Sequence, residues 1–151
     1  LQIANIVSPD EAMRTKIDRA INDNEVCDVN PFGVVGLIAA YNEGEQWLDD
    51  LRHYLYENYM FAYNFFKERL PRFSVAPLEG TYLMWINCEA SGLDSDAVCR
   101  LLESEGEVML SPGGIYGQGG ERFVRLNLAC PRSVLDDGLK RIAVVLEKLI
   151  V

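Results

Sequence analysis

The spacing of apolar residues predicts that the first half of the chain is helical. From residue 43 to 70, apolar side chains recur at intervals of three and four positions until Pro71 ends the pattern, which indicates one long helix. A helix over 8–24 is expected to begin with Ser8 as its N-cap. The nearly uniformly apolar stretch "NPFGVVGLIAAY" at 30–41 predicts a short buried helix, and the opening "LQIANIV" is typical of a strand.

The second half of the chain alternates between strand and helix patterns. Strands are predicted at "RFSVAP", "TYLMWIN", "EVMLS" and residues 122–128, with a helix over 95–105 that ends at Gly106 and a terminal helix that starts at Pro131. The fold class is therefore predicted to be α+β, with a small, mostly antiparallel sheet covered by helices and preceded by a helical segment that includes the long helix.

One predicted strand, within "FVRLNLACPRS", carries an arginine at its centre. Alternation places Phe123, Arg125 and Asn127 on one face and apolar side chains on the other. Arg125 is either an ordinary solvated strand residue or a group that projects into a cleft to hold an anion. A guanidinium suits a carboxylate bound through two hydrogen bonds. The strand pattern leaves both interpretations open.

Composition narrows the classes of partner. The chain has 151 residues, of which 49% are hydrophobic, which is enough for one globular core. A formal net charge of −9 argues against nucleic acid and acidic membranes as partners. The widely spaced cysteines and the single histidine, His53, make a metal site improbable and favour reduced thiols in a cytoplasmic protein. No apolar run is as long as a membrane span.

Few residues offer catalytic chemistry. The loop "SPGGIYGQGGE" lacks the Lys-Ser or Lys-Thr pair of a phosphate-binding loop, and it leads into a strand. His53 has charged and aromatic helical neighbours, which favours a solvated side chain. The lysines lie in charged helical contexts that do not suit a Schiff base: Lys16, Lys67, Lys140 and Lys148. What remains is one candidate anion-binding arginine beside a glycine-rich loop.

Three stretches together resemble a known family: "VNPFGVVGLIAAYNEGEQWLDDLRHYLYEN", "EGTYLMWINCEASGL" and "LSPGGIYGQGGERFVRLNLACPRS". They resemble the C-terminal part of fold-type I aminotransferases of class I/II, which depend on pyridoxal 5'-phosphate (PLP). The resemblance is strongest to the MalY/PatB branch of carbon-sulfur lyases similar to cystathionine β-lyase. It runs over essentially the whole chain.

The resemblance implies a substrate site. Arg125 corresponds to the arginine that binds the α-carboxylate of an amino-acid substrate in this superfamily. Gly80, Thr81 and Tyr82 correspond to the start of a strand that lines the substrate side of the cleft. Gly113 and Tyr116 correspond to the loop over its mouth. The site is thus expected to bind substrate and to contain no catalytic residue of its own.

The resemblance also implies that the chain is part of a longer PLP enzyme, because the lysine that holds the cofactor would precede Leu1. We expect the 151 residues alone to be inactive and to bind no PLP. The full-length enzyme would be a carbon-sulfur β-lyase or an aminotransferase, and these alternatives remain open. The alternative from another class is a stand-alone, non-catalytic module for ligand binding or protein interaction.

Two regions are expected on this basis. Residues 1–42 would belong to, or contact, the PLP-binding large domain, and residues 43–151 would form the small domain with the connecting helix 43–70. Several apolar side chains before residue 48 would then lack a partner within the chain: Leu1, Ile3, Ile6, Val34, Val35, Leu37, Ile38 and Trp47. Covering them favours a homodimer or a higher homo-oligomer.

Overall fold

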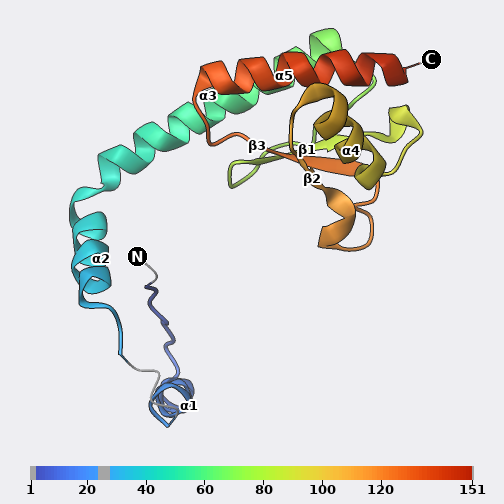
Figure 1. Ribbon diagram of the computed structural model, residues 1–151. Coiled ribbons are helices and arrows are strands. Elements are labelled where there is room, and N and C mark those ends of the chain that lie inside the picture. The colour runs from blue at the N-terminus through green and yellow to red at the C-terminus, as the bar shows by residue number, and fades with distance from the viewer. Residues whose placement is uncertain (1–2, 24–27, 151) are drawn as a thin grey trace. The chain divides into compact units, whose positions relative to one another are not determined.

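The computed structural model describes residues 3–23 and 28–150 and divides the chain into two compact units, Leu1–Asp50 and Leu51–Val151 (Figure 1). The predicted division into 1–42 and 43–151 refers to contacts with a domain outside this sequence, and it stays a prediction.

The first helix, α1 (Glu11–Asn22), begins two residues later than its sequence pattern predicts. Its N-cap is Asp10, whose carboxylate accepts hydrogen bonds from the amides of Ala12 at 2.8 Å and Met13 at 3.3 Å. The prediction of Ser8 as N-cap is therefore wrong. The Ser8 hydroxyl instead accepts from the Asp10 amide at 3.2 Å. A carboxylate also interacts favourably with the helix dipole, so Asp10 is the stronger cap.

Helix α2 (Pro31–Glu43) starts as predicted, with the Asn30 side chain accepting from the Phe32 amide at 2.9 Å. It is not buried within its own unit, because Gly33 is its only buried residue. Phe32 is 74% exposed and Tyr41 is 77% exposed. Within Leu1–Asp50 the helix is therefore mostly exposed, and its burial against a surface outside this sequence stays a prediction.

The opening segment is not a strand in the part that the structure describes. Residues 3–7 have no strand partner, and the two residues before them lie outside the described part. Ile3 is half-buried, and a Cβ added to Gly33 would lie 3.4 Å from the Cβ of Ile3. The segment thus meets α2 through one apolar side chain instead of through backbone pairing.

The second unit contains a three-stranded antiparallel sheet of β1 (Leu83–Asn87), β2 (Ser111–Pro112) and β3 (Phe123–Asn127), in the order β1-β3-β2. The predicted α+β class with a small antiparallel sheet is confirmed. The predicted strand "RFSVAP" contributes only an isolated bridge between Val75 and Ile86.

Helices cover one face of this sheet. The long helix α3 (Glu45–Arg69) and the last helix α5 (Arg132–Leu146) lie on the same side of it, and α4 (Ser95–Gly106) contacts α5, β2 and β3 (Figure 1). Hydrogen bonds join α3 and α5 at both ends, from the Arg132 amide to the Tyr54 hydroxyl at 2.8 Å and from Arg69 Nε to Glu147 Oε1 at 2.7 Å. The two helices are therefore parallel.

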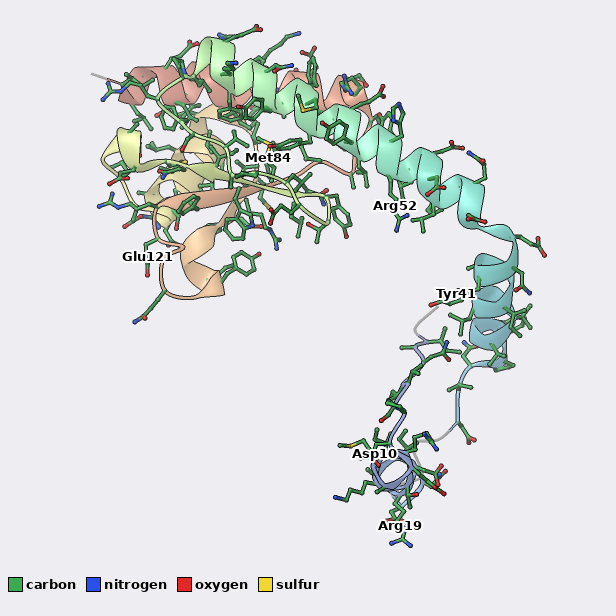
Figure 2. The ribbon with its side chains drawn as sticks, turned by 180° about the vertical axis from the view of Figure 1, so that it is seen from behind. Asp10, Arg19, Tyr41, Arg52, Met84 and Glu121 are labelled. Atoms are coloured by element: carbon green, nitrogen blue, oxygen red, sulfur yellow. The ribbon has the colours of Figure 1, made fainter. Side chains whose placement is uncertain are left out.

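Burial alternates along the strands. Met84, Ile86, Val124 and Leu126 are buried in the core beneath the helices, and Figure 2 shows Met84 in this layer. The residues between them point to the other face, where the short 3₁₀ turn Gly113–Tyr116 lies (Figure 1). We call this second face, with Trp85, Phe123 and Arg125, the open face of the sheet. Arg125 lies on it as the alternation predicts.

The end of α4 differs from its sequence interpretation. Gly106 is the last helical residue, and Glu107 takes the left-handed conformation with φ 53°. A Cβ on Gly106 would lie 3.2 Å from Cγ2 of Val145. The glycine is therefore explained by the close packing of α4 on α5 rather than by a left-handed helix end.

Candidate functional site

The side chain of Arg125 lies in a row that crosses the three strands. Its cross-strand partners are Trp85 on β1 and Ser111 on β2. Nη2 of Arg125 donates a hydrogen bond to the Ser111 hydroxyl at 3.2 Å, and Cζ lies 4.6 Å from the centroid of the Tyr116 ring. The half-buried guanidinium is thus held by a neutral hydroxyl and an aromatic ring.

Arg125 has no acidic partner in the part of the chain that the structure describes. Several other cations on this unit, though not all, pair with carboxylates: Arg69 with Glu147, Lys140 with Asp136, Arg141 with Glu107 and Asp137, and Lys148 with Glu105. A guanidinium has five N–H donors, and one hydroxyl accepts from Arg125. The remaining donors can bind an anion, and their fork geometry suits a carboxylate.

Aromatic rings surround the arginine on the open face. The rings of Trp85 and Tyr116 meet edge to face, with centroids 5.5 Å apart and an interplanar angle of 87°. Phe123 contacts Trp85 in the same manner at 6.5 Å. These rings border a cavity of about 330 Å³ that is completed by Ala76, Gly113, Gly117, Gln118, Gly119 and Gly120. Arg125 does not line this cavity, but it contacts Tyr116, which does.

Gly113 closes the loop that carries Tyr116. A Cβ at this position would collide with the carbonyl oxygens of Gly120 and Phe123, so only glycine fits. The loop is also tied down by hydrogen bonds from the Gly114 amide to the Ser95 hydroxyl at 3.3 Å and from the Gly119 amide to Glu121 at 2.9 Å. In Figure 2 Glu121 lies at the end of the unit where this loop is found.

The predicted residues Gly80, Thr81 and Tyr82 lie just before β1 and are exposed. Thr81 has φ 65°, which is uncommon for a β-branched residue, and its hydroxyl accepts from the Leu83 amide at 3.2 Å. Such strain is found most often at functional sites. A cavity of about 390 Å³ here is bordered by Arg52, Leu55, Tyr56, Leu78, Glu79, Gly80 and Thr81; Figure 2 labels Arg52 on α3.

The structure brings some of the predicted residues together and separates others. Gly113, Tyr116 and Arg125 share the open face. The strand start is linked to β3 further along, where the Leu128 amide donates to the Tyr82 carbonyl at 2.9 Å. Among the described residues, no hydrogen bond or ring contact joins Gly80, Thr81 or Tyr82 to Arg125.

Two neighbours of Arg125 were not identified from the sequence. Trp85 is in the predicted strand "TYLMWIN", and Ser111 precedes the glycine-rich loop, but neither stood out by chemistry. Both become site residues because the strand register places them opposite Arg125. The alternation of apolar residues along β1 indicates on which face of the sheet Trp85 lies. It does not indicate which residue of β3 lies opposite Trp85, because the strand register cannot be read from the sequence.

A buried asparagine fixes the chain after β3. Asn58 on α3 is 0% exposed, and its amide group donates to the carbonyls of Leu128 at 2.9 Å and Cys130 at 3.0 Å. Its carbonyl oxygen accepts from Nε of Arg132 at 2.7 Å, and the Arg132 guanidinium lies over the Phe61 ring. These contacts anchor the strand that carries Arg125 to the long helix.

The lysines of the chain do not fit a site for PLP. All four are exposed, and Lys140 and Lys148 pair with Asp136 and Glu105. A lysine that forms a Schiff base needs a desolvated setting, which none of them has. The setting of these lysines therefore does not match that of a Schiff-base lysine, whereas the free donors of Arg125 fit a carboxylate.

Known proteins resemble this chain in sequence and in fold. No family model matches the chain. Cystathionine beta-lyase PatB from Bacillus subtilis (strain 168) is 36% identical over 146 residues, which are 97% of this chain and 38% of PatB. A PLP-bound putative aminotransferase from Clostridium difficile 630 superposes with a TM-score of 0.88 at 38% identity, over 93% of this chain and 36% of that one.

Cystalysin from Treponema denticola, whose crystal structure contains PLP, superposes with a TM-score of 0.80 at 29% identity, over 95% of this chain and 36% of cystalysin. The chain spans 38% of the length of PatB and similar shares of these two structures. The predicted resemblance is confirmed: the chain is similar in sequence and fold to the C-terminal region of fold-type I PLP-dependent enzymes. Within that class it resembles the branch of cystathionine β-lyases and carbon-sulfur lyases.

No helix among the described residues is both long enough and apolar enough to cross a membrane.

Proposed function

We propose that this chain forms the part of a PLP-dependent enzyme that binds the carboxylate of an amino-acid substrate. The single observation that carries the proposal is Arg125. Its side chain is half-buried, lies over the Tyr116 ring and has no acidic partner among the described residues. In a protein of net charge −9, such a group is a local exception that attracts anions.

In this proposal the chain's own residues act by binding and orientation. Two N–H groups of Arg125 donate to the two carboxylate oxygens, which fixes the direction of the substrate's Cα relative to the sheet. Tyr116 and Gly113 form the wall above the carboxylate, and Gly80, Thr81 and Tyr82 form the wall at the start of β1. No proton transfer is assigned to these residues.

The reaction we favour is carbon-sulfur β-elimination, with amino transfer as the second candidate. The sequence relative PatB is named a cystathionine β-lyase, and a carbon-sulfur lyase from Staphylococcus hominis superposes with a TM-score of 0.79 at 28% identity. The cofactor would be held by a lysine outside this sequence, since none of the four lysines fits it. The 151 residues by themselves are then inactive and bind no PLP.

The test of the reaction uses the full product of the gene that carries this sequence. A β-lyase releases pyruvate from cystathionine, whereas an aminotransferase exchanges an amino group with a keto acid. Pyruvate release that depends on added PLP, without keto-acid exchange, is the expected result. If the PLP-loaded protein shows neither pyruvate release nor amino-group exchange, that result contradicts the proposal.

We further propose that the unit Leu1–Asp50 takes part in a homodimer or a higher homo-oligomer, with residues 1–42 against the cofactor-binding domain or a second subunit. Ile6, Val35, Ile38 and Trp47 are between 55% and 68% exposed, and Val34 is also exposed. Ile3 and Leu37 are half-buried, and Leu1 lies outside the described residues. Soluble monomers rarely expose so many neighbouring apolar side chains.

Sedimentation velocity over a range of concentrations tests this association. A dimer or larger species is expected, and Val35→Asp together with Ile38→Asp should weaken it. Glu43→Asp, on the same helix, is the control. A monomer at high concentration, with its first forty or so residues packed on their own chain, would contradict it. A cytoplasmic location is part of the proposal and would be checked by fractionation.

A further inference from the structure

The hydroxyl of Tyr116 has no hydrogen-bond partner among the described residues, whereas its ring contacts Arg125 and Trp85. Its ring centroid lies 4.6 Å from Cζ of Arg125 and 5.5 Å from the centroid of the Trp85 ring, and the residue is 49% exposed. In sequence it lies nine positions before Arg125, on the 3₁₀ turn Gly113–Tyr116. The position of Tyr116 therefore allows its ring to orient the Arg125 guanidinium.

We propose that Tyr116 is a positioning residue for Arg125. This inference rests on the proposed function and deepens it. An arginine side chain has four rotatable bonds, and holding it in one orientation before the ligand arrives removes an entropic cost from binding. Cζ of the guanidinium lies over the Tyr116 ring, and Nη2 donates to the Ser111 hydroxyl. The uncovered donors remain for a carboxylate.

The support behind the ring makes this arrangement stable. Trp85 meets Tyr116 at 87°, and Phe123 meets Trp85 at 78°, so each ring packs its edge or face on the next. The turn itself is fixed by the close approach of Gly113 to Gly120, where a Cβ would collide. The Tyr116 ring is thus held in place, and its aromatic face, rather than its hydroxyl, orients the Arg125 guanidinium.

Positioning by the ring does not need the Tyr116 hydroxyl. This distinguishes the proposed role from one in which the hydroxyl makes a direct hydrogen bond to the substrate. Tyr116→Phe keeps the ring and should keep the function. Tyr116→Leu keeps apolar bulk, but it removes the ring face that attracts a cation. Ile115→Ala is the matched control, because Ile115 is on the same turn and is 66% exposed.

The experiment uses the 151-residue chain and propionate as the probe, with propionamide as the neutral probe of the same size. Binding is followed by NMR at constant ionic strength through the Nε–Hε signal of Arg125. In the protein without ligand, nuclear Overhauser effects from the Tyr116 ring to the Arg125 side chain are expected. They should persist when propionate is bound and propionamide should not bind.

Tyr116→Leu should weaken propionate binding about three- to tenfold and shift the Arg125 Nε–Hε signal toward that of a free side chain. Tyr116→Phe and Ile115→Ala should stay within about twofold of the parent sequence. Unchanged affinity in Tyr116→Leu would overturn the inference. So would loss of the ring contacts when propionate binds, a result that does not depend on the folding of any variant.

Arg125→Gln separates this inference from the proposed function. If it abolishes propionate binding while Tyr116→Leu has no effect, the carboxylate site stands and the positioning role fails. If Arg125→Gln leaves propionate binding unchanged, the carboxylate site itself fails and the positioning role fails with it.

Discussion

Cζ of Arg125 lies 4.6 Å from the centre of the Tyr116 ring, and this guanidinium has no carboxylate partner among the described residues. An exposed strand arginine would be surrounded by water. Here the guanidinium lies over an aromatic ring that packs on Trp85. This arrangement favours the interpretation in which Arg125 binds an anion over the one in which it is an ordinary solvated strand residue.

Replacing Arg125 should damage substrate binding more than cofactor binding. In the full gene product, Arg125→Lys should raise KM for amino acids and lower kcat, because a point charge replaces a planar guanidinium that can form two hydrogen bonds. The loss of transition-state stabilisation, calculated from kcat/KM, should be about 2 kcal/mol or more. Arg125→Gln should cost more. Steady-state kinetics and PLP absorbance measure the two effects.

The control for this prediction is Arg100→Lys, an exposed arginine on α4, which should behave as the unchanged protein does. Unchanged kinetics in both Arg125 variants would mean that the arginine is only a strand residue. Loss of PLP absorbance in step with activity would instead indicate a structural defect.

Asn58→Ala should destabilise the second unit by about 3 kcal/mol, because the carbonyls of Leu128 and Cys130 and the Arg132 side chain would lose their buried partner. Denaturant unfolding monitored by tryptophan fluorescence gives the free energy. Asn64→Ala, on the exposed side of the same helix, should change it by less than about 0.5 kcal/mol. Equal effects of the two substitutions would contradict the role assigned to Asn58.

Thr81→Gly should be about 1 kcal/mol more stable than Thr81→Ala, since glycine adopts φ 65° without the strain that a side chain brings there. Both substitutions remove the hydroxyl that accepts from Leu83, so the difference between them reports the backbone strain alone. Thermal unfolding of the two variants measures this difference. Equal stability of the two would show that the left-handed backbone is not strained.

The cysteine thiols should differ in reactivity. Burial raises the pKa of Cys88 to about 12, and burial followed by the nearby Asp96 raises the pKa of Cys99 to about 11. Burial also raises the pKa of Cys130, which is less deeply buried. Because the thiolate is the reactive form, Cys88 and Cys99 should stay unmodified by iodoacetamide at pH 8, and Cys130 should react before them.

Peptide mapping by mass spectrometry identifies the alkylated positions, and reaction in denaturant is the control in which these thiols should react alike. Raising the pH toward 11 should speed modification of Cys99 before that of Cys88, in the order of their pKa values. Rapid alkylation of Cys88 at pH 8 in the folded protein would contradict its burial.

The sequence by itself determined the features that depend on local pattern. Apolar spacing and Pro71 located α3, alternation placed Arg125 opposite the buried Val124 and Leu126, and Asn30 with Pro31 marked the start of α2. The motif order around Gly113 and Arg125 gave the resemblance to PLP enzymes, which the comparisons confirm. Each of these signals lies within a few residues of the structure that it predicts.

Only the tertiary structure decided which distant residues meet. The pairing of Trp85 and Ser111 with Arg125, and the anchoring of Leu128 by Asn58 across 70 positions, depend on strand register and helix placement. The choice of Asp10 over Ser8 as N-cap and the packing role of Gly106 likewise needed backbone geometry. Such contacts are set by the packing of the whole core, because one shift in register would turn every side chain of a strand to the opposite face.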